Sequence, residues 1–453
     1  MATEGDKHMR NTTDRSTPVS GAATELAPDV MTLLVAALRR AVRGESDVVG
    51  TDTLLEQVAL GGTDVSDAVV PGIRESGALG GRIRAQAGRG WVSADDSDSD
   101  SGSGSDTVVR RSEDEWETDA AWREARWRHT LAARGTDPEP GRELPRMSGA
   151  LRDCLLTALG AARAEGSLSV RPRHVARALL APGTRAHEAM TLERLDPAVA
   201  ATALDALDAR AADAERPESQ GVTLLRRAGV FGRSGNRLTR AFMSWTAGSM
   251  INGSPVVAAV TTEAVRQAIR SGHAAAGPVD LLLGILALDR AMHVAGYEFP
   301  APLAEVNSAA GLLRGHGVHQ ASLAQVVRPV PSGAVADGEP GKPSGPPVGG
   351  EPGALSRPAD RVVAVARLIA AESGSPTVGT VHLLAALLDD RSAGGTEGGG
   401  EGESAGSREG IATLPSSEGI GTLPSSEGIA ALLSSIGADL AALRADLGRR
   451  QGA

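Results

Sequence analysis

Aromatic residues are scarce in this chain of 453 residues: one tyrosine, three phenylalanines and five tryptophans make up 2% of it. Sheet sandwiches fill their interiors with aromatic and β-branched side chains, so this shortage excludes a large all-β protein. Hydrophobic residues still make up 41% of the chain, and alanine, leucine and valine, which suit close-packed helices, supply most of them. The composition therefore predicts an all-α fold.

Cysteine and long apolar runs are also nearly absent. Cys154 is the single cysteine, which excludes an intrachain disulfide or a cysteine-based zinc cluster and fits a reducing compartment. The sequence shows no signal-peptide pattern and no apolar run of about 18 residues. We therefore expect a cytoplasmic protein with no membrane partner.

Basic charge is in deficit, because 46 basic residues face 56 acidic ones and leave a net charge of −10. No global positive field attracts phosphate backbones, so nucleic acid is not an expected partner. The acidic run at 95–106 fails as a calcium loop, because Ser101 and Thr107 replace the required glycine and glutamate. No phosphate-binding P-loop occurs in the sequence. No cofactor and no metal are therefore expected.

The sequence does contain one helical unit in four copies, aligned on the anchors Val49, Val170, Ala276 and Val378. Residues five, six, nine and ten positions after each anchor are apolar, which is the spacing of one stripe along an α-helix. They are Leu54, Leu55, Val58 and Ala59; Val175, Ala176, Leu179 and Leu180; Leu281, Leu282, Ile285 and Leu286; and Leu383, Leu384, Leu387 and Leu388. Two residues after the anchors stand Thr51, Pro172, Pro278 and Thr380. Threonine caps helices and proline suits their first turn, so a helix is predicted to begin there.

A further helix is predicted upstream of each anchor. Alanine stands twelve and eight residues before all four anchors: Ala37 and Ala41, Ala158 and Ala162, Ala264 and Ala268, and Ala366 and Ala370. Residues four apart share one helix face, so a neighbouring helix can approach closely at these small side chains. We expect a tight helix–helix contact at each alanine pair.

Downstream of the anchors, a helix–turn–helix signal follows. We place it at 73–79, 192–196 and 433–440, with 293–297 as the nearest counterpart in the third copy. A glycine or aspartate marks the turn. Each unit then has about four short helices over roughly 60–75 residues, too little to bury its own apolar faces well. The units are therefore expected to pair.

These residues resemble a known family. The run Val378-Gly379-Thr380-Val381-His382-Leu383-Leu384 resembles the GTEHLL signature of the N-terminal domain of Clp-type AAA+ unfoldases, and the runs from Ala276 and Val49 are similar. The alanine pairs and the turn at 437–440 fit the same pattern. The resemblance covers about two-thirds of the chain. It implies two globules, each a pseudo-twofold pair of four-helix repeats, that dock substrates, adaptors, arginine-phosphorylated proteins or cyclic peptides.

The chain also departs from that family. It holds no AAA+ module with a Walker A motif. The acidic residue of the signature survives as Asp52 in one copy, and its histidine survives as His174 and His382 in two. The family's ligand pocket is therefore not carried over residue by residue.

The composition of the segments between the copies sets the expected domain boundaries. We expect a disordered N-terminus at 1–27, repeat 1 at 28–86, an acidic linker with a tryptophan-containing helix at 87–146, repeat 2 at 147–213, a connector at 214–234, repeat 3 at 235–318, a Pro/Gly linker at 319–354, and repeat 4 at 355–453 with a Gly/Ser/Glu-rich insertion at 391–428. The polar and Pro/Gly-rich segments are expected to be disordered linkers between two globules.

Three tryptophans are candidate partner-binding residues. Trp116 and Trp127 are eleven residues apart and share a helix face, whereas Trp122 points roughly 120° away. The segment is acidic first and basic last, which complements a helix dipole. We favour a helix that plugs the gap between repeats 1 and 2. The alternative is a helix that binds a partner, because exposed tryptophan and arginine are common interface anchors.

Other candidate residues have plainer interpretations. His382 is a further candidate for partner binding, although a histidine in the first turn of a helix is more typically capping or solvent-facing, as for His174. Cys154 fills a core position of the repeat and is not expected to be a nucleophile. His316 and His319 lack a third metal ligand nearby in sequence.

The sequence therefore predicts a non-catalytic module that binds proteins or peptides. Its expected partners are Clp protease components or their substrates, with the chain acting as an adaptor or a decoy. A structural scaffold is the main alternative, and a peptidase-associated enzyme is a weaker one, because no nucleophile–base pair is found.

Overall fold

The computed structural model describes residues 21–87, 112–133, 143–211, 216–231, 254–327, 353–389 and 426–451. These residues form 19 helices and four two-residue strands. The described chain is therefore mostly helical, as the composition predicts.

The elements divide along the sequence into an earlier and a later set. The earlier set is β1 (Glu25–Leu26), α1 (Pro28–Arg43), β2 (Val48–Val49), α2 (Thr51–Leu60), α3 (Asp64–Val69), α4 (Ile73–Ala87), α5 (Glu113–Ala133), β3 (Arg146–Met147), α6 (Gly149–Ala164), β4 (Ser169–Val170), α7 (Pro172–Leu179), α8 (Arg185–Leu192) and α9 (Pro197–Ala211). The later set is α10 (Gln220–Arg227), α12 (Pro255–Ser271), α13 (Pro278–Ala295), α14 (Ala301–Ala304), α15 (Ala309–Gly315), α16 (Gln320–Val327), α17 (Arg357–Glu372), α18 (Thr380–Leu388), α19 (Ser426–Ser435) and α20 (Leu440–Gln451).

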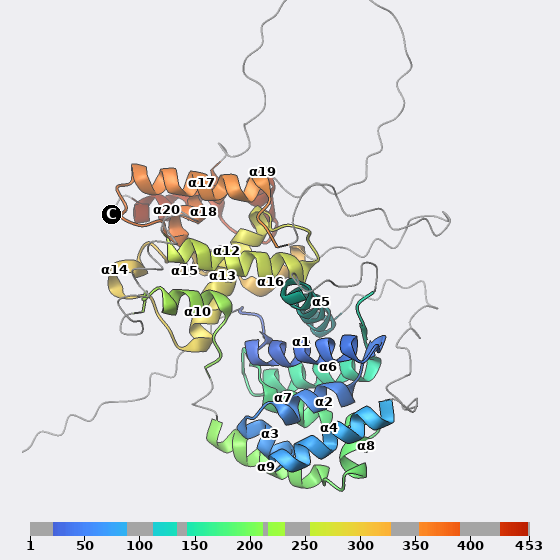
Figure 1. The fold of residues 1–453 in the computed structure, drawn as a ribbon. Helices are drawn as coiled ribbons and strands as arrows, with labels where there is room; N and C mark the ends of the chain where they lie inside the picture. The colour runs from blue at the N-terminus through green and yellow to red at the C-terminus, as the bar shows by residue number, and fades with distance from the viewer. Residues whose placement is uncertain are drawn as a thin grey trace, which may run out of the picture.

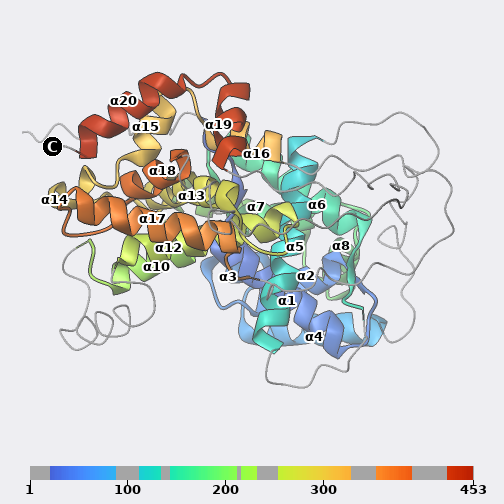
Figure 2. The ribbon, with the colours of Figure 1, turned by 90° about the horizontal axis from the view of Figure 1, so that it is seen from above.

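Buried apolar side chains form two clusters that follow this division. The first core extends along the sequence from Leu26 to Leu204, and the second from Val222 to Leu447. Figure 1 shows the two groups of helices one above the other, with α5 at their boundary. Helix α5, seen from above in Figure 2, contacts α1 and α6 of the first group and α12 of the second. The contacts that α5 makes on its two sides therefore link the first core to the second.

The predicted helix starts are confirmed in all four copies. Helices α2, α7, α13 and α18 begin at Thr51, Pro172, Pro278 and Thr380. The two threonines do not cap their own helices, however. The Oγ1 of Thr51 accepts a hydrogen bond from the Ala186 amide at 3.1 Å, and that of Thr380 accepts one from the Ala309 amide at 3.3 Å. Each threonine thus caps the start of a helix in the neighbouring copy.

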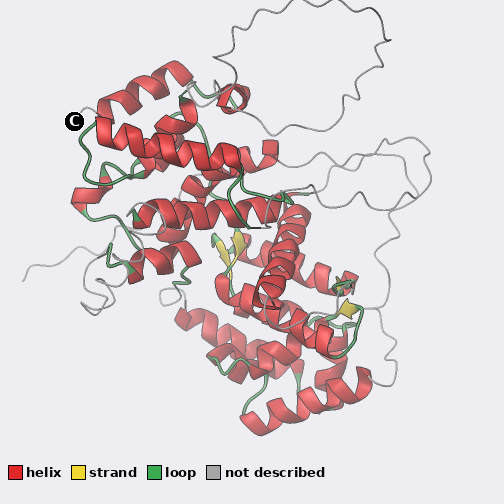
Figure 3. Ribbon diagram, turned by 45° about the horizontal axis from the view of Figure 1, so that its top comes forward, coloured by secondary structure: helices red, strands yellow, loops and turns green. Residues whose placement is uncertain are grey.

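The short strands connect copies crosswise. The strand before α1 (β1) pairs in parallel with the strand before α7 (β4), and the strand before α2 (β2) pairs with the strand before α6 (β3). Figure 3 shows these strands in yellow among the helices. In the second core, Ala276 before α13 bridges Leu355 before α17, and the Ser254 hydroxyl before α12 donates to the Val378 carbonyl before α18 at 2.5 Å. The same reciprocal arrangement therefore occurs in both cores.

The upstream alanines lie at buried helix contacts, as predicted. All eight are at most 4% exposed: Ala37, Ala41, Ala158, Ala162, Ala264, Ala268, Ala366 and Ala370. Helices α12 and α13 cross closely, because a Cβ added to Gly284 would lie 2.7 Å from the Val260 carbonyl oxygen and 3.0 Å from the Ala264 Cβ. Small residues on both helices allow this approach.

The turns after the signature helices are only partly where the sequence places them. In the second and fourth copies, a turn lies within the predicted spans, at Arg194 with a φ of 58° and at Gly437 with a φ of 86°. In the first copy, 73–79 lies inside α4, because the chain turns earlier at Gly72, with a φ of 100°. In the third copy, 293–297 contains the end of α13, where Gly296 has a left-handed φ of 69°, and a further left-handed turn lies at Gly317, between α15 and α16.

Several segments assigned to linkers contain ordered structure. Residues 21–27 belong to the expected disordered N-terminus, yet they include β1, which pairs with β4 and is buried. The connector at 214–234 contains α10, whose buried side chains join the second core, and the linker at 319–354 begins with α16. Local composition missed these segments, since their order comes from distant contacts. The end of the expected insertion, 426–428, likewise belongs to α19. The expected disorder at 1–20, 88–111, 328–352 and 391–425 falls outside the described residues.

Candidate functional site

Six charged side chains meet where α5 lies between the two cores. This helix contacts α1 and α6 on one side and α12 on the other. Three carboxylates come from residues packed with the first core, and three guanidinium groups come from α12 and α13. The six are Glu25, Glu117, Glu124, Arg266, Arg270 and Arg290, and we call them the ionic seam. All are buried except Arg266, whose side chain is 13% exposed.

Arg266 stands at the centre of the ionic seam. Its Nη2 donates to Oε2 of Glu25 at 2.6 Å, and its Nε donates to Oε1 of Glu124 at 3.1 Å. Its Nη1 donates to Oε2 of Glu263, one turn earlier on α12, at 3.4 Å. One guanidinium therefore joins β1, α5 and α12.

Arg270 lies one turn further along α12 on the same face. Its Nη1 donates to Oε2 of Glu124 at 3.0 Å, and its Nη2 forms a short ion pair with Glu117. In the opposite direction, the Nε of Arg123 on α5 donates to the Arg270 carbonyl in the last turn of α12 at 2.8 Å. A cation at the C-terminal end of a helix is favourable because the carbonyl groups there carry partial negative charge. Helices α5 and α12 thus exchange charged contacts in both directions.

Arg290 and Gln320 fix the N-terminal segment to the second core. The Nε of Arg290 donates to the Ala23 carbonyl at 2.7 Å, and its Nη2 donates to the Leu168 carbonyl at 3.0 Å. The Nε2 of Gln320 donates to Oε1 of Glu25 at 2.8 Å. The β1–β4 pair is therefore held by side chains from α13 and α16.

Burial and charge shift the carboxyl pKa values in opposite directions. Burial alone raises the pKa of Glu124, but Arg266 and its neighbouring arginines outweigh it and lower the pKa to about 2. Glu25 follows the same logic, and its pKa lies well below its ordinary value. Burial raises the pKa of Glu117 and prevails there, because Arg270 opposes it while the charge of Glu25 adds to it. Glu117 is thus the weakest acid of the ionic seam.

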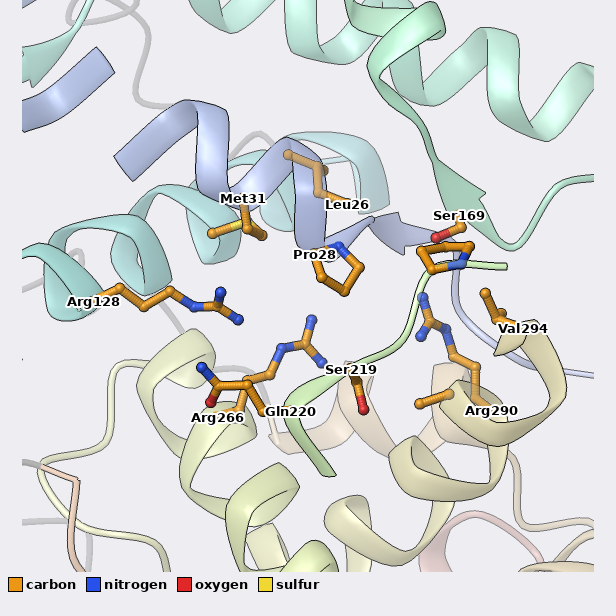
Figure 4. A pocket seen from close by; sticks show the side chains of 12 residues that line it. Leu26, Pro28, Met31, Arg128, Ser169, Ser219, Gln220, Arg266, Arg290 and Val294 are labelled. Carbon is orange, nitrogen blue, oxygen red and sulfur yellow. The ribbon is translucent and has the colours of Figure 1, made fainter. Parts of the chain in front are cut away.

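A small cavity opens beside the ionic seam. Figure 4 shows the guanidinium groups of Arg128, Arg266 and Arg290 turned toward it from α5, α12 and α13. Its apolar wall comes from the first core and from α13, with Leu26, Pro28, Met31, Ala291 and Val294. Its enclosed part has room for roughly one water molecule. The cavity is a gap at the boundary of the cores and is too small to hold a peptide.

The three candidate tryptophans lie on α5 in different surroundings. Trp122 is 8% exposed and belongs to the first core, while Trp116 and Trp127 are half-buried. The ring of Trp127 packs over Gly353, where an added Cβ would lie 3.1 Å from the ring. The helix therefore covers α1 and α6, as the plug interpretation expects, and also contacts the second core through α12. The interpretation as a partner-binding helix stays a prediction.

His382 is 2% exposed and its imidazole Nδ1 accepts a hydrogen bond from the Gly379 amide at 3.0 Å. His174 makes the same contact with the Arg171 amide at 3.0 Å, and Asp280 makes it with the Gly277 amide at 2.8 Å. Burial lowers the pKa of both histidines. The histidine position of the signature is therefore a buried helix cap, which agrees with the capping interpretation.

Cys154 is buried in the first core, as expected for its position in the repeat. The Nε2 of His316 lies 3.0 Å from Oδ2 of Asp446, while His319 packs over Gly21. Among the described residues, no three histidine, cysteine, aspartate or glutamate side chains group as a metal site requires. The acidic run at 95–106 lies outside the described part of the chain.

Sequence analysis missed the ionic seam. A signal existed: Arg266 and Arg270 are spaced four residues apart on α12, and Arg290 follows a long, mostly apolar run of α13. Such charges imply partners, because a buried arginine is costly unless it is paired. The sequence did not identify those partners, because no local pattern connects Arg266 with Glu25, 241 residues away.

Compared with family models, curated proteins and solved structures, the chain shows no match to any of them. Among the described helices, no single one is long and apolar enough to cross a membrane. One pair bent by 115°, Gly428–Ser435 with Leu440–Arg450, passes that test by length and composition alone.

Proposed function

We propose that the chain is a non-catalytic protein- or peptide-binding module that resembles the Clp N-terminal domain and acts as an adaptor or a decoy for Clp substrates. The observation that carries this proposal is the crosswise pairing of copies within each core. In the first core, β1 pairs with β4 and β2 with β3, so each copy supplies one strand to the start of the other copy's signature helix. Such reciprocity supports two pseudo-twofold pairs of repeats.

The capping contacts of the signature add support. His174, Asp280 and His382 occupy one position of the repeat, and each accepts the backbone N–H three residues earlier. The motif that resembles the Clp family therefore occupies positions that define the fold. Because these side chains are used by the helix caps, partner recognition falls to other surfaces.

A scaffold is the second candidate function, and the ionic seam favours it. Three carboxylates and three guanidinium groups fix the two cores against each other across α5. A rigid pair of cores would hold two partners at a set distance without presenting a substrate to an unfoldase.

A degradation assay tests the proposal and separates these roles. A Clp unfoldase with its protease degrades a fluorescent substrate, and the purified chain is added in increasing amounts. An adaptor raises the rate and a decoy lowers it, whereas a scaffold leaves it unchanged. An unfoldase that lacks its own N-terminal domain is the matched control, because a decoy that competes with that domain loses its effect there.

No change in rate, together with no complex by analytical ultracentrifugation, would overturn the adaptor and decoy roles. The non-catalytic part has its own test with fluorogenic peptides. Cleavage by the purified chain that a single substitution in it abolishes would make the protein a peptidase.

A further inference from the structure

Helix α5 has two unlike faces. Its small and aromatic side chains, Ala121, Trp122 and Ala125, pack with the first core. Its carboxylates, Glu117 and Glu124, are seven residues apart and face the arginines of α12. Seven residues are close to two helical turns, so both carboxylates lie on one side. The helix therefore fills a slot with an apolar wall made by α1 and α6 and a basic wall made by α12.

Apolar burial holds α5 less strongly than it holds the neighbouring helices. Of the seven buried residues of α5, Trp122 is the only large apolar one, and the rest are three alanines, one threonine and two glutamates. By comparison, α1 buries Val30, Met31, Leu34 and Leu38 as well as two alanines. Buried ion pairs add little net stability, because desolvation of the charges offsets much of their attraction. Neither apolar burial nor the ion pairs therefore hold α5 strongly in place, although the buried arginines still require carboxylate partners.

Unsatisfied polar atoms show that the fit is incomplete. On α5, Nε1 of Trp127 and Nε of Arg128 are buried without a hydrogen-bond partner among the described residues. On α12, the same holds for Nε2 of Gln267 and Nε of Arg270. Each buried polar group without a partner costs on the order of 1–3 kcal/mol. Arg270 is at the contact between α5 and α12, whereas Nε1 of Trp127 faces Gly353. Helix α5 therefore fits its surroundings incompletely at more than one place.

We propose that this slot is a docking site for an acidic amphipathic helix, and that α5 occupies it as an internal competitor. The partner carries two glutamates seven residues apart beside a strip of alanine and tryptophan. Its carboxylates pair with Arg266 and Arg270 as Glu117 and Glu124 do. An arginine directly before the second glutamate donates to the last turn of α12, as Arg123 does. The inference rests on the proposed protein-binding function and assigns it a surface and a ligand chemistry.

The probe is a fluorescently labelled peptide with the sequence of residues 112–133, titrated by anisotropy into the full chain. The chain is used unchanged and as the double variant Glu117→Gln/Glu124→Gln, which removes the internal carboxylates but keeps the shape of the side chains. We expect the peptide to bind the double variant at least tenfold more tightly than the unchanged chain. Adding Arg270→Gln to that variant should abolish the gain, and raising the salt concentration should reduce it.

A peptide carrying Gln in place of both glutamates is the matched control and is expected not to bind. Equal affinity of the two peptides, or equal binding to the unchanged chain and the folded double variant, overturns the proposal. If circular dichroism shows that the double variant is unfolded, Glu117→Gln alone takes its place, because it removes one contact. Unfolding of both variants would also overturn it, since α5 would then be an indispensable part of the core. No Clp component enters this titration, so its failure is distinguishable from failure of the degradation assay.

Discussion

At the scale of single residues, Glu117 and Glu124 have similar surroundings and opposite titration behaviour. Both are buried on α5, and both pair with Arg270. Glu124 also pairs with Arg266 and Arg128, whereas Glu117 lies near the charge of Glu25. The balance between desolvation and neighbouring charge therefore decides each pKa, and burial alone does not.

Substitution of these two glutamates tests that balance. Glu124→Gln removes the carboxylate while the arginines stay buried, and breaking a buried pair in this way costs about 3–5 kcal/mol. Glu117→Gln removes a carboxylate whose ionised form is already disfavoured, so its effect should be much smaller. Urea unfolding at pH 7, followed by circular dichroism, gives both free energies of unfolding. Equal losses for the two variants would contradict the assigned pKa directions.

At the scale of secondary-structure elements, close packing depends on small residues at a few crossings. Gly284 on α13 faces Val260 and Ala264 on α12, where no space remains for a Cβ. Gly160 on α6 is exposed, and no heavy atom of the described residues lies within 4 Å of such a Cβ. Both glycines lie within helices, so they differ only in whether a neighbouring helix occupies the space that a Cβ would need.

Alanine substitution at these glycines should give effects of opposite sign. Gly284→Ala should force α12 and α13 apart and cost about 1–3 kcal/mol. Gly160→Ala should stabilise the chain by about 0.5–1 kcal/mol, because alanine favours the helix over glycine. Thermal melts of both variants measure the difference, and a stabilised Gly284→Ala would show that the helices do not cross there.

The fourth alanine pair allows a second test within one helix. Ala366 on α17 is 0% exposed, whereas Leu368 two residues later is 62% exposed. Ala366→Leu should overpack the second core and cost about 1–3 kcal/mol. Leu368→Ala, the control on the opposite side of the same helix, should stay within about 0.5 kcal/mol of the unchanged chain. A melt unaffected by Ala366→Leu would place that face in solvent.

The sequence predicts those elements whose formation depends on residues close together along the chain. The signature helices could be placed to the residue at Thr51 or Pro278, because their apolar stripe and their starting residues lie in one short window. Gly77 was misread as a turn, since a glycine inside a helix looks the same as one that ends it. Helix α10 was missed because its order depends on packing against the second core, in which Val222 and Leu225 are buried.

At the scale of the whole molecule, the candidate site is built from contacts that no local window contains. Arg266 reaches Glu25 across 241 residues and Glu124 across 142. The sequence predicted that α5 exists and is charged, yet it could not place α12 against it. The repeat pattern relates the four copies to one another. It contains no information on how the two cores contact each other. The ionic seam therefore exists only in the folded chain, where these distant segments meet.

The ionic seam makes stability depend on pH with two opposing contributions. Glu124 has a pKa of about 2 in the folded chain, below its ordinary value of 4.5. Its contribution is therefore present above pH 4.5 and is lost as the pH falls from there toward 2. Glu117 has a raised pKa, so its contribution is present below 4.5 and is lost as the pH rises through its folded pKa. Stability should accordingly peak at a mildly acidic pH and fall on both sides.

Urea unfolding at a series of pH values from 7 to 3 measures this dependence. Lowering the pKa of Glu124 from 4.5 to about 2 corresponds to roughly 3 kcal/mol, so the loss below pH 4.5 should be large. Glu124→Gln should reduce the loss of stability below pH 4.5 (the acid limb). It should leave unchanged the increase in the free energy of unfolding as the pH falls from 7 to mildly acidic values (the rise). Glu117→Gln should remove the rise and leave the acid limb, because Glu25, with its lowered pKa, and Glu124 still lose their charge there. A free energy of unfolding that stays constant between pH 4.5 and 3 in the unchanged chain would mean that the seam carboxylates are not held ionised by the arginines.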